Sequence, residues 1–285
     1  MTTLEDRIVG LVKETSSSIP EDVAAALRSA LRRERKGSSA AAVLRTILDN
    51  CEAARRGGVP LCQDTGSLLF VVDSRLRRKV TPALLSRAVA RATALGYLRK
   101  NTIDAVTGAS LDDNVAPGAP VVRYADCGEG SPARERGVTL LMKGGGSENM
   151  SRQYSLPDES LGAGRDLDGV RKCVLDAVVR AQGFGCAPGI LGVCVGGDRA
   201  TGFEVAKEQL LRPLGDSAAT APLRALEKLV LRQANSLGIG PMGLGGKTTL
   251  LGVNIASRTR VPASFFVTVA YMCWACRRRT LLIEP

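Results

Sequence analysis

The hydrophobic pattern of the first sixty residues predicts three helices. Apolar positions recur there at the three- and four-residue spacing of a buried helix face. The segments with this spacing are Leu4–Lys13, Glu21–Glu34 and Ala40–Arg55. The second and third segments follow Ser18-Ile19-Pro20 and Ser38-Ser39, which are typical helix starts, and the pattern ends at Gly57-Gly58-Val59-Pro60. We therefore expect a helical N-terminal region over residues 1–57.

From residue 58 onward, short apolar runs alternate with helical patterns. The runs predict strands at Leu68–Val72, Val121–Tyr124, Val138–Met142, Ile190–Val195, Thr248–Ile255 and Ala263–Met272. The helical patterns cover Pro82–Leu98, Asp168–Ala181, Ala200–Leu211 and Leu223–Leu237. This alternation predicts the α/β class, with a mixed α+β arrangement of strands and helices. Because no repeat of fixed period and no linker is evident, we expect a single domain over residues 1–285, with its core over residues 58–285.

No segment has the length of a membrane helix. The longest nearly apolar stretch, Phe265–Cys276, is about a dozen residues, well short of the roughly 20 that a membrane span needs. We interpret it as a buried strand. The N-terminal residues MTTLEDRIVG lack the basic-then-apolar order of a secretory signal. We expect a cytoplasmic protein without a membrane partner.

The charge balance favours an anionic partner. The chain has 39 Lys and Arg against 28 Asp and Glu, a formal net charge of +11. Nucleic acid, a carboxylate substrate or an acidic protein surface would each suit this charge. Aromatic residues make up only 4% of the chain, and basic clusters such as Arg277–Arg279 contain no interleaved stacking residues. We therefore expect no nucleic-acid binding.

Three cysteines in loops or at predicted strand ends stand out. They are Cys62 in LCQDTG (61–66), Cys186 in FGCAPG (184–189) and Cys273 in MCWAC (272–276). Cytosolic thiols are usually metal ligands or packing residues rather than disulfides, and iron–sulfur ligands can be far apart in sequence. The simpler alternative for the first segment is an Asp-Thr-Gly turn beside a chance cysteine.

Two glycine-rich segments invite a nucleotide-binding interpretation that their details exclude. Gly240–Thr248 resembles a phosphate-binding loop, but Pro241 stands where that motif requires glycine. Lys143–Ser147 follows a predicted strand, and we expect it to be a loop. It lacks the helix-opening pattern of a dinucleotide fingerprint.

Six segments, taken together and in order, carry a specific family resemblance. They are PLCQDTG (60–66), YLRKNT (97–102), KGGGSEN (143–149), GGDRATG (196–202), GPMGLGGKTTLLGV (240–253) and PASFFVTVAYMCWACRRR (262–279). The chain resembles the separate α subunit of class I fumarate hydratases and of the related L-tartrate dehydratases, from about residue 5 to the C-terminus. The resemblance implies a hydro-lyase of small dicarboxylates, with fumarate and malate as the first expectation and L-tartrate as the close alternative.

The resemblance also implies a cofactor and a set of site residues. In that family three cysteines hold a [4Fe–4S] cluster whose fourth iron binds the substrate, and the matching ligands here are Cys62, Cys186 and Cys273. The matching substrate-pocket residues are Gln63, Asp64, Arg99, Gly144, Gly145 and Gly146, of which Gln63 and Asp64 are the catalytic candidates. Without the resemblance, Arg99 could equally be a surface arginine at a helix end.

The remaining cysteines have no motif position. We interpret Cys51, Cys127, Cys173 and Cys194 as small buried hydrophobic residues. Cys273-x-x-Cys276 could be half of a zinc site or a redox pair, but zinc needs a second ligand pair and the chain has no histidine. If Cys273 lies on a strand, Cys276 points to the opposite face and suits packing better.

The sequence departs from the family in one position. The resembling enzymes place a histidine just before the segment that matches Pro262-Ala263-Ser264, where this chain has Arg260-Val261. A cluster-binding homologue with impaired catalysis is therefore a further alternative. No segment resembles the smaller catalytic half of these enzymes. We expect a separate β subunit, in an α2β2 hetero-oligomer, to provide the missing proton-transfer group.

Overall fold

The described residues divide into two compact units. The computed structural model describes residues 2–128, 131–133 and 135–284. The first unit comprises Met1–Glu21, Ile47–Gly145 and Ala275–Pro285, and the second comprises Asp22–Thr46 and Gly146–Trp274. The expectation of a single domain over residues 1–285 stays a prediction. The predicted α/β class is confirmed, because both units combine helices with a mixed sheet.

The three predicted N-terminal helices are present. They are α1 (Leu4–Ser17), α2 (Glu21–Arg33) and α3 (Ser39–Gly57). A capping box starts α1, since the Thr3 hydroxyl accepts from the Asp6 N–H and the Asp6 carboxylate accepts from the Thr3 N–H. This reciprocal pair satisfies backbone donors that a helix start leaves unpaired.

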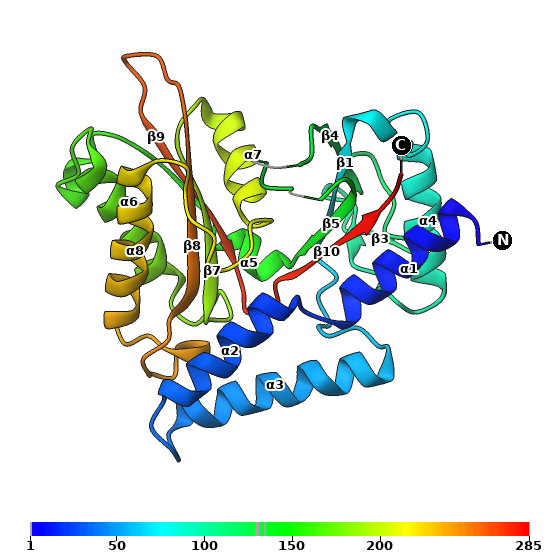
Figure 1. Ribbon diagram of the computed structural model, residues 1–285, viewed down its shortest axis with the longest axis horizontal. Helices are drawn as coiled ribbons and strands as arrows, with labels where there is room; N and C mark the ends of the chain where they lie inside the picture. Colours follow the sequence, from blue (N-terminus) through cyan, green and yellow to red (C-terminus); the bar gives the residue numbers. More distant parts are fainter. Residues whose placement is uncertain (1, 129–130, 134, 285) are drawn as a thin grey trace. The chain divides into compact units, whose positions relative to one another are not determined.

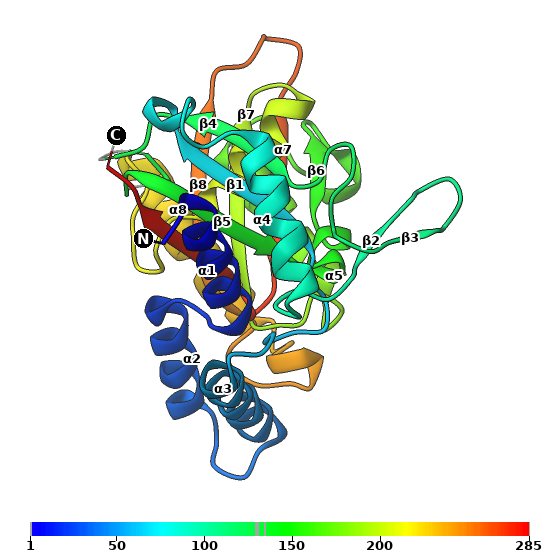
Figure 2. The same ribbon diagram turned by 90° about the vertical axis from the view of Figure 1, so that its right-hand side faces the viewer.

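The first unit contains a four-stranded sheet covered by helices (Figure 1). Its order is β10 (Arg277–Leu282), β5 (Gly137–Lys143), β1 (Ser67–Asp73) and β4 (Val121–Ala125). The β1 and β4 strands are parallel, and the other pairs are antiparallel. The crossover from β1 to β4 contains α4 (Pro82–Ala94), which packs against α1, as Figure 2 shows. Side chains such as Ile8, Leu85 and Phe70 form the buried core between these layers.

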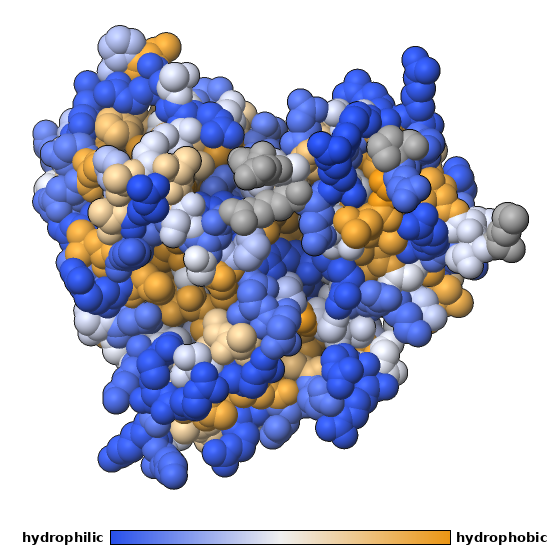
Figure 3. Space-filling view, in the orientation of Figure 1, coloured by the Kyte–Doolittle hydropathy of each residue, from blue (hydrophilic) through white to orange (hydrophobic). Residues whose placement is uncertain are grey.

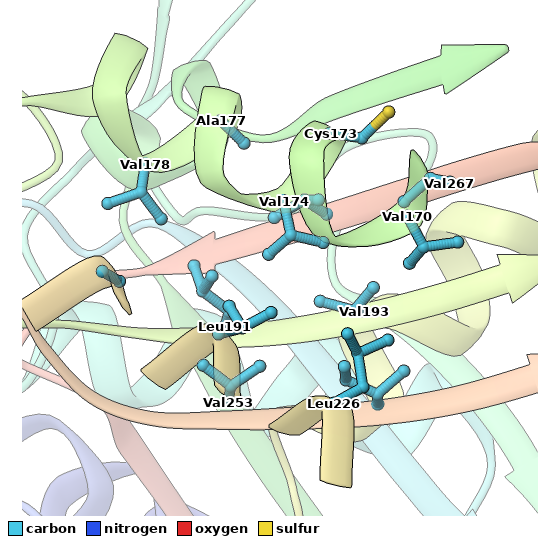
Figure 4. Packing of buried hydrophobic residues seen from close by; sticks show 14 of the residues in the cluster. Val170, Cys173, Val174, Ala177, Val178, Leu191, Val193, Leu226, Val253 and Val267 are labelled. Carbon is cyan, nitrogen blue, oxygen red and sulfur yellow. The ribbon is translucent and has the colours of Figure 1, made fainter. Parts of the chain in front are cut away.

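The second unit contains another four-stranded sheet with its own core. Its order is β6 (Arg152–Ser155), β9 (Phe266–Met272), β7 (Gly189–Gly196) and β8 (Leu250–Arg258). Its long helices are α6 (Leu167–Ala181), α7 (Arg199–Gln209) and α8 (Ala221–Ser236). Figure 4 shows how Val174 of α6 and Leu226 of α8 pack with Leu191 of β7 and Val253 of β8. Burial of such side chains is the main source of stability in this unit.

The two sheets have the same topology. In each, a first strand pairs in parallel with the second and antiparallel with the third, and a fourth strand extends the third. The fourth strand does not follow the third in sequence. Instead, β6 follows β5 along the chain but joins the second sheet, and β10 follows β9 but joins the first. The two units therefore exchange their edge strands.

Some boundaries differ from the sequence-based expectations. The α4 helix ends at Ala94 rather than Leu98, and Gly96 just beyond it adopts a left-handed φ of 75°. The predicted loop at Lys143–Ser147 is wrong in its second half, because the short helix α5 (Gly145–Asn149) begins there. The strand expected over Phe265–Cys276 ends at Met272.

Several short elements complete the described chain. They are β2 (Thr102–Ile103), β3 (Ser110–Leu111), and the 3₁₀ turns η1 (Ser74–Leu76), η2 (Glu159–Leu161) and η3 (Pro241–Gly243). The β2–β3 hairpin projects from the first unit (Figure 2). Hydrophilic side chains cover much of the face seen in Figure 3, with apolar patches between them. Within the described ranges, no helix is long and apolar enough to cross a membrane.

Candidate functional site

The candidate site residues lie at equivalent ends of the two sheets. In the first unit, Cys62–Gly66 precedes β1 and Gly144 follows β5, and the strand register pairs Ser67 with Lys143. In the second unit, Cys186 precedes β7 and Cys273 follows β9, with Ile190 paired to Met272. The start of the first strand and the end of the third strand are neighbours in each sheet. Loops held by a sheet in this way commonly carry functional groups.

Asp64 is the most highly connected residue of the first unit's candidate site. Its carboxylate accepts hydrogen bonds from the Gly145 N–H at 2.7 Å and from the Asn101 side-chain amide at 3.1 Å. Its backbone carbonyl accepts a hydrogen bond from the Arg277 guanidinium at 2.8 Å. Three segments far apart in sequence therefore fix the half-buried Asp64, two of them through its carboxylate and one through its backbone. Its oxygens still have lone pairs for a ligand, because an ionised carboxylate can accept about four hydrogen bonds.

Arg99 is anchored through its backbone. The Thr65 hydroxyl donates to the Arg99 carbonyl at 2.7 Å and accepts from the Arg99 N–H at 3.0 Å. The Asn114 side-chain amide also donates to the Arg99 carbonyl, at 2.9 Å. The helix-end alternative for Arg99 is wrong, since α4 ends at Ala94. The exposed guanidinium thus extends from a fixed loop, where it is available to an anion.

Gly66 allows the loop before β1 to contact the end of β5. Its φ is 72°, and a Cβ atom on it would lie 2.2 Å from the Lys143 carbonyl oxygen. Only glycine combines this backbone conformation with so close an approach. The short distance between the Cys62–Gly66 loop and the glycine segment after β5 therefore depends on this residue.

The two remaining predicted pocket residues have different surroundings. Gln63 is exposed in the loop, next to Asp64. Gly146 belongs to the second unit, while Gly144 and Gly145 belong to the first. The structure thus brings Asp64, Gly145 and the Arg99 loop together within the first unit. The positions of Gln63 and Gly146 in one pocket with them stay a prediction.

Cys62 has a polar contact suited to a metal-bound sulfur. The Asp64 N–H lies 3.5 Å from the Cys62 sulfur and donates to it. Hydrogen bonds to ligand sulfurs are one means by which proteins set the reduction potential of iron–sulfur clusters. Cys62 is half-buried, so it is neither a core residue nor a fully exposed thiol.

The second unit brings Cys186 and Cys273 to the same buried tyrosine. Burial is the largest cause of a raised pKa of the Tyr271 hydroxyl. The nearby Cys273 and Cys186 raise this pKa further. A Cβ on Gly185 or Gly189 would lie 2.4 or 2.6 Å from the Tyr271 ring, so glycine is needed directly before Cys186 and three residues after it. The Trp274 N–H also donates to the Cys186 carbonyl at 3.2 Å. Two of the three predicted ligands therefore share one neighbourhood.

The backbone at Cys186 is in an unfavourable conformation. Its φ of 52° is in the left-handed region, which costs a residue other than glycine about 1–3 kcal/mol. The Cys186 N–H donates to the Gly183 carbonyl at 3.0 Å, which helps to hold this conformation. Residues in such conformations concentrate at functional sites.

The four cysteines outside the motifs suit a structural role. Cys173 and Cys194 are buried, as expected, whereas Cys51 and Cys127 are only half-buried, which corrects their interpretation as buried residues. Burial raises the pKa of the Cys173 thiol to about 12 and those of the other three to about 11. Because the metal ligand is the thiolate, a raised thiol pKa makes metal binding less favourable.

The donor set fits an iron–sulfur cluster in its chemistry. Cys62, Cys186 and Cys273 are all half-buried loop residues that offer the soft sulfur donors such clusters require. Cys62 lies in the first unit and the other two lie in the second. Among the described residues, no group of three or more His, Cys, Asp or Glu side chains is gathered as a metal site. The assignment of these cysteines to one cluster therefore stays a prediction.

Cys276 lies between strands rather than on one. The loop from β9 to β10 contains both Cys273 and Cys276, so the argument from opposite faces of a strand does not apply. Cys276 is completely buried, in contrast to the half-buried Cys273. This burial agrees with a packing role for Cys276.

Arg260 lies in the short segment before Pro262 where the resemblance leads us to expect a histidine. The Arg260 guanidinium donates to the carbonyls of Val261, Pro262 and Ser264 and lies 4.5 Å from the centre of the Phe265 ring. Arginine stays protonated at all physiological pH values and cannot serve as a general base. Arg260 instead holds the loop between β8 and β9.

Sequence reasoning missed three residues that shape the site. Asn101 and Arg277 bind Asp64, and Tyr271 lies beside two candidate ligands. All three fall within the resembling segments, but residue type alone does not assign them a role. The sequence held no signal for Arg277, because burial decreases steadily from Arg277 to the half-buried Arg278 and the exposed Arg279 instead of alternating.

Comparison with known proteins assigns the chain to a family. The family model described as fumarate hydratase (Fumerase) matches residues 5–281, nearly the whole chain. The chain belongs to the fumarate hydratase family.

Individual relatives give a finer comparison. A protein of Geobacillus stearothermophilus named putative fumarate hydratase class I is 45% identical over 293 residues, which cover 100% of this chain and 56% of that relative. A Methanocaldococcus jannaschii protein named putative L(+)-tartrate dehydratase subunit alpha is 33% identical, over 96% of this chain and 95% of its own length. The L(+)-tartrate dehydratase subunit alpha of Escherichia coli K12 is 29% identical, over 99% of this chain and 91% of its own. The chain thus spans little more than half of the first relative and nearly all of the other two.

Proposed function

We propose that this chain is the α subunit of an iron–sulfur hydro-lyase that interconverts fumarate and malate. The observation that carries the proposal is Asp64, which three distant segments fix and whose N–H donates to the Cys62 sulfur. The choice of fumarate rests on identity, which is 45% to the relative named fumarate hydratase and 33% to the M. jannaschii relative named tartrate dehydratase subunit alpha. L-tartrate is the second candidate substrate.

The proposed cofactor is a [4Fe–4S] cluster held by Cys62, Cys186 and Cys273. When bound, it supplies a Lewis-acid iron that favours departure of the substrate hydroxyl as water. The proposal is supported by the soft donor set and by the hydrogen bond from the Asp64 N–H to the Cys62 sulfur. The high thiol pKa values of Cys51, Cys127, Cys173 and Cys194 argue against their use as alternative ligands.

The residues of the first unit have distinct proposed roles toward a dicarboxylate. Arg99 grips one substrate carboxylate in a fork, since its backbone is fixed and its guanidinium is exposed. The Gln63 side-chain amide donates a hydrogen bond to the substrate. The Asp64 carboxylate accepts a hydrogen bond from the substrate or takes up a proton from it. The net charge of +11 favours approach of a dianion.

The glycine segment after β5 acts partly through Asp64. The N–H of Gly145 already donates to the Asp64 carboxylate, so this N–H positions Asp64 rather than binding substrate. Gly144 and Gly146 remain the proposed backbone contacts to the substrate, because glycine lets a ligand approach the backbone closely.

We propose that a separate β subunit completes the enzyme in an α2β2 assembly in the cytoplasm. The chain covers 95% of a relative named as an alpha subunit but only 56% of the relative named putative fumarate hydratase class I. Because this chain has no histidine, the β subunit would supply the missing proton-transfer group.

The test is anaerobic co-expression of the chain with the β-type polypeptide encoded in the same genome. The proposal predicts bound iron and acid-labile sulfide, and turnover of fumarate faster than of L-tartrate. Turnover of L-tartrate alone would favour the second substrate. A full cluster without turnover of either would show an impaired homologue, and full activity of the α chain alone would refute the two-subunit proposal.

Matched variants test the ligands. Cys62→Ser, Cys186→Ser and Cys273→Ser should each lower the iron content of the co-expressed complex severely. Cys51→Ser is the control, because Cys51 is also half-buried but lies outside the motifs. Equal iron content in Cys62→Ser and Cys51→Ser would remove Cys62 from the ligand set.

A further inference from the structure

Arg277 is a buried arginine at the start of β10. Its residue surface is 1% exposed, and it pairs in register with Met142 of β5. The strand that carries it is the red arrow of Figure 1. Arginine is rarely buried this completely unless it has a partner.

The guanidinium of Arg277 binds one loop and leaves two nitrogens unused. Its Nη2 donates to the carbonyls of Asp64 at 2.8 Å and Thr65 at 3.3 Å. Its Nε and Nη1 are buried and have no hydrogen-bond partner among the described residues. Burying a charged donor without an acceptor is unfavourable, so these two N–H groups require an anion or another acceptor.

Two other buried ions, Arg212 and Asp73, are paired differently. Arg212, also buried, donates to the carboxylates of Glu227 and Asp216, each at 3.0 Å. The buried Asp73 carboxylate is paired with Arg75. Within the described ranges, Arg277 forms no ion pair with a carboxylate and contacts only backbone carbonyls through its Nη2. The positive charge of Arg277 is therefore not balanced by a protein carboxylate.

The loop that Arg277 holds is the loop that carries Cys62. The Asp64 carbonyl accepts from Arg277, and the Asp64 N–H donates to the Cys62 sulfur. Arg277 thus fixes the residue that contacts the proposed ligand sulfur. Three thiolates on a 2+ iron–sulfur core leave a net negative charge, which a buried cation would stabilise.

We propose that Arg277 is a positioning residue for the Cys62–Gly66 loop whose unbalanced charge offsets the negative charge of the cluster held there. This proposal rests on the cluster assignment in the proposed function. It gives Arg277 two separable properties, an Nη2 group that donates to the Asp64 and Thr65 carbonyls and a fixed positive charge. The hydrogen bonds of Nη2 order the loop, and the charge favours the reduced, more negative state of the cluster.

Two substitutions separate these properties. Arg277→Met removes both the Nη2 donor and the charge, whereas Arg277→Lys keeps a charge without the rigid guanidinium geometry that places Nη2. Arg279→Met is the control, because Arg279 lies on the same strand but is exposed and pairs with Glu14. All variants are studied in the anaerobically purified complex with the β subunit. The measurements are the reduction midpoint of the cluster and hydrogen exchange of the amides in residues 62–66.

The expected results differ for each variant. Arg277→Met should make reduction at least tenfold less favourable, which is about 59 mV for one electron. Arg277→Lys should keep the midpoint near that of the parent protein. Both Arg277 variants should increase hydrogen exchange in the loop, and Arg279→Met should change neither quantity.

Each contrary result overturns a defined part of the proposal. If the reduction midpoint of Arg277→Met equals that of the parent protein, the charge of Arg277 does not act on the cluster. If hydrogen exchange of residues 62–66 is unchanged in both Arg277 variants, Arg277 does not order the loop. A parent protein without iron and sulfide refutes the cluster assignment, and the charge role with it. The exchange measurement then still decides the loop role.

Discussion

The carboxylate of Asp64 accepts a hydrogen bond from the backbone N–H of Gly145 at 2.7 Å, across 81 residues of sequence. The bond joins the loop before β1 to the first residue of α5. Backbone N–H groups at a helix start need an acceptor, which Asp64 provides here. Asp64 therefore has a structural role in addition to its proposed chemical one, and substitutions must separate the two.

Asp64→Asn and Asp64→Ala should separate these roles. The asparagine side chain of the first variant would retain an oxygen that can accept from Gly145, whereas alanine leaves that N–H without its partner. We expect Asp64→Ala to lower the free energy of unfolding by about 1–3 kcal/mol and Asp64→Asn to lower it less. Both should reduce hydratase turnover severely. Urea unfolding and steady-state rates measure the two effects, and normal turnover in Asp64→Asn would exclude a catalytic role for the carboxylate.

Gly66→Ala should destabilise the first unit far more than Gly96→Ala. Both glycines have left-handed backbones, with φ of 72° and 75°, so alanine has a similar conformational cost of about 1–2 kcal/mol at each. A Cβ on Gly66 would also lie 2.2 Å from the Lys143 carbonyl oxygen, whereas Gly96 has nothing within 4 Å. Thermal unfolding of the two variants measures the difference. Equal losses of stability would show that the loop can move away from β5 at little cost.

Arg99→Ala should weaken substrate binding without weakening the fold. The contacts that anchor Arg99 are made by its backbone, so they survive truncation of the exposed side chain. We expect a loss of dicarboxylate binding on the order of 2–5 kcal/mol, seen as a higher KM, and an unchanged melting temperature. Lys100→Ala is the control, since Lys100 is an exposed neighbour paired with Asp112 at 3.0 Å. If KM and kcat are unchanged in Arg99→Ala, Arg99 does not contact the substrate.

The buried thiol of Cys173 should make stability fall at alkaline pH. Burial raises its pKa from 9.0 to about 12, so above pH 9 the unfolded state releases this proton while the folded state keeps it. The unfolded state then binds fewer protons, and stability decreases as pH rises toward 12. The stability lost in Cys173→Ala should therefore be smaller at pH 10.5 than at pH 8. Val178→Ala, in the same core, should show no such dependence when both are melted in reductant.

Local patterns were sufficient to predict much of the fold. The apolar runs of β1, β5 and β7 and the periodicity of α1 to α3 carry strong signals, because these elements bury whole strands or helix faces. The start of α5 was not predictable locally, because the Gly145 N–H receives its acceptor from Asp64. The β10 strand was also missed, because Arg277–Arg279 has the composition of a basic surface cluster.

The candidate site was predictable in composition but not in its connections. The resembling segments identified Cys62, Asp64 and Arg99, and the structure shows what holds them. The partners Asn101, Thr65 and Arg277 are between 34 and 213 residues from the residues they bind. Such pairs depend on strand order and register, which no single-segment pattern encodes.

The exchange of edge strands has a consequence for synthesis on the ribosome. The edge of β5 that β10 covers stays open until residues 277–282 have been made, although β1 and β5 have long been available to pair. An open sheet edge is a template for association with other chains. The Asp64 loop also lacks Arg277 during this interval. Completion of the first sheet therefore awaits the synthesis of residues 277–282, and until then the nascent chain has an unpaired strand edge that chaperones could protect.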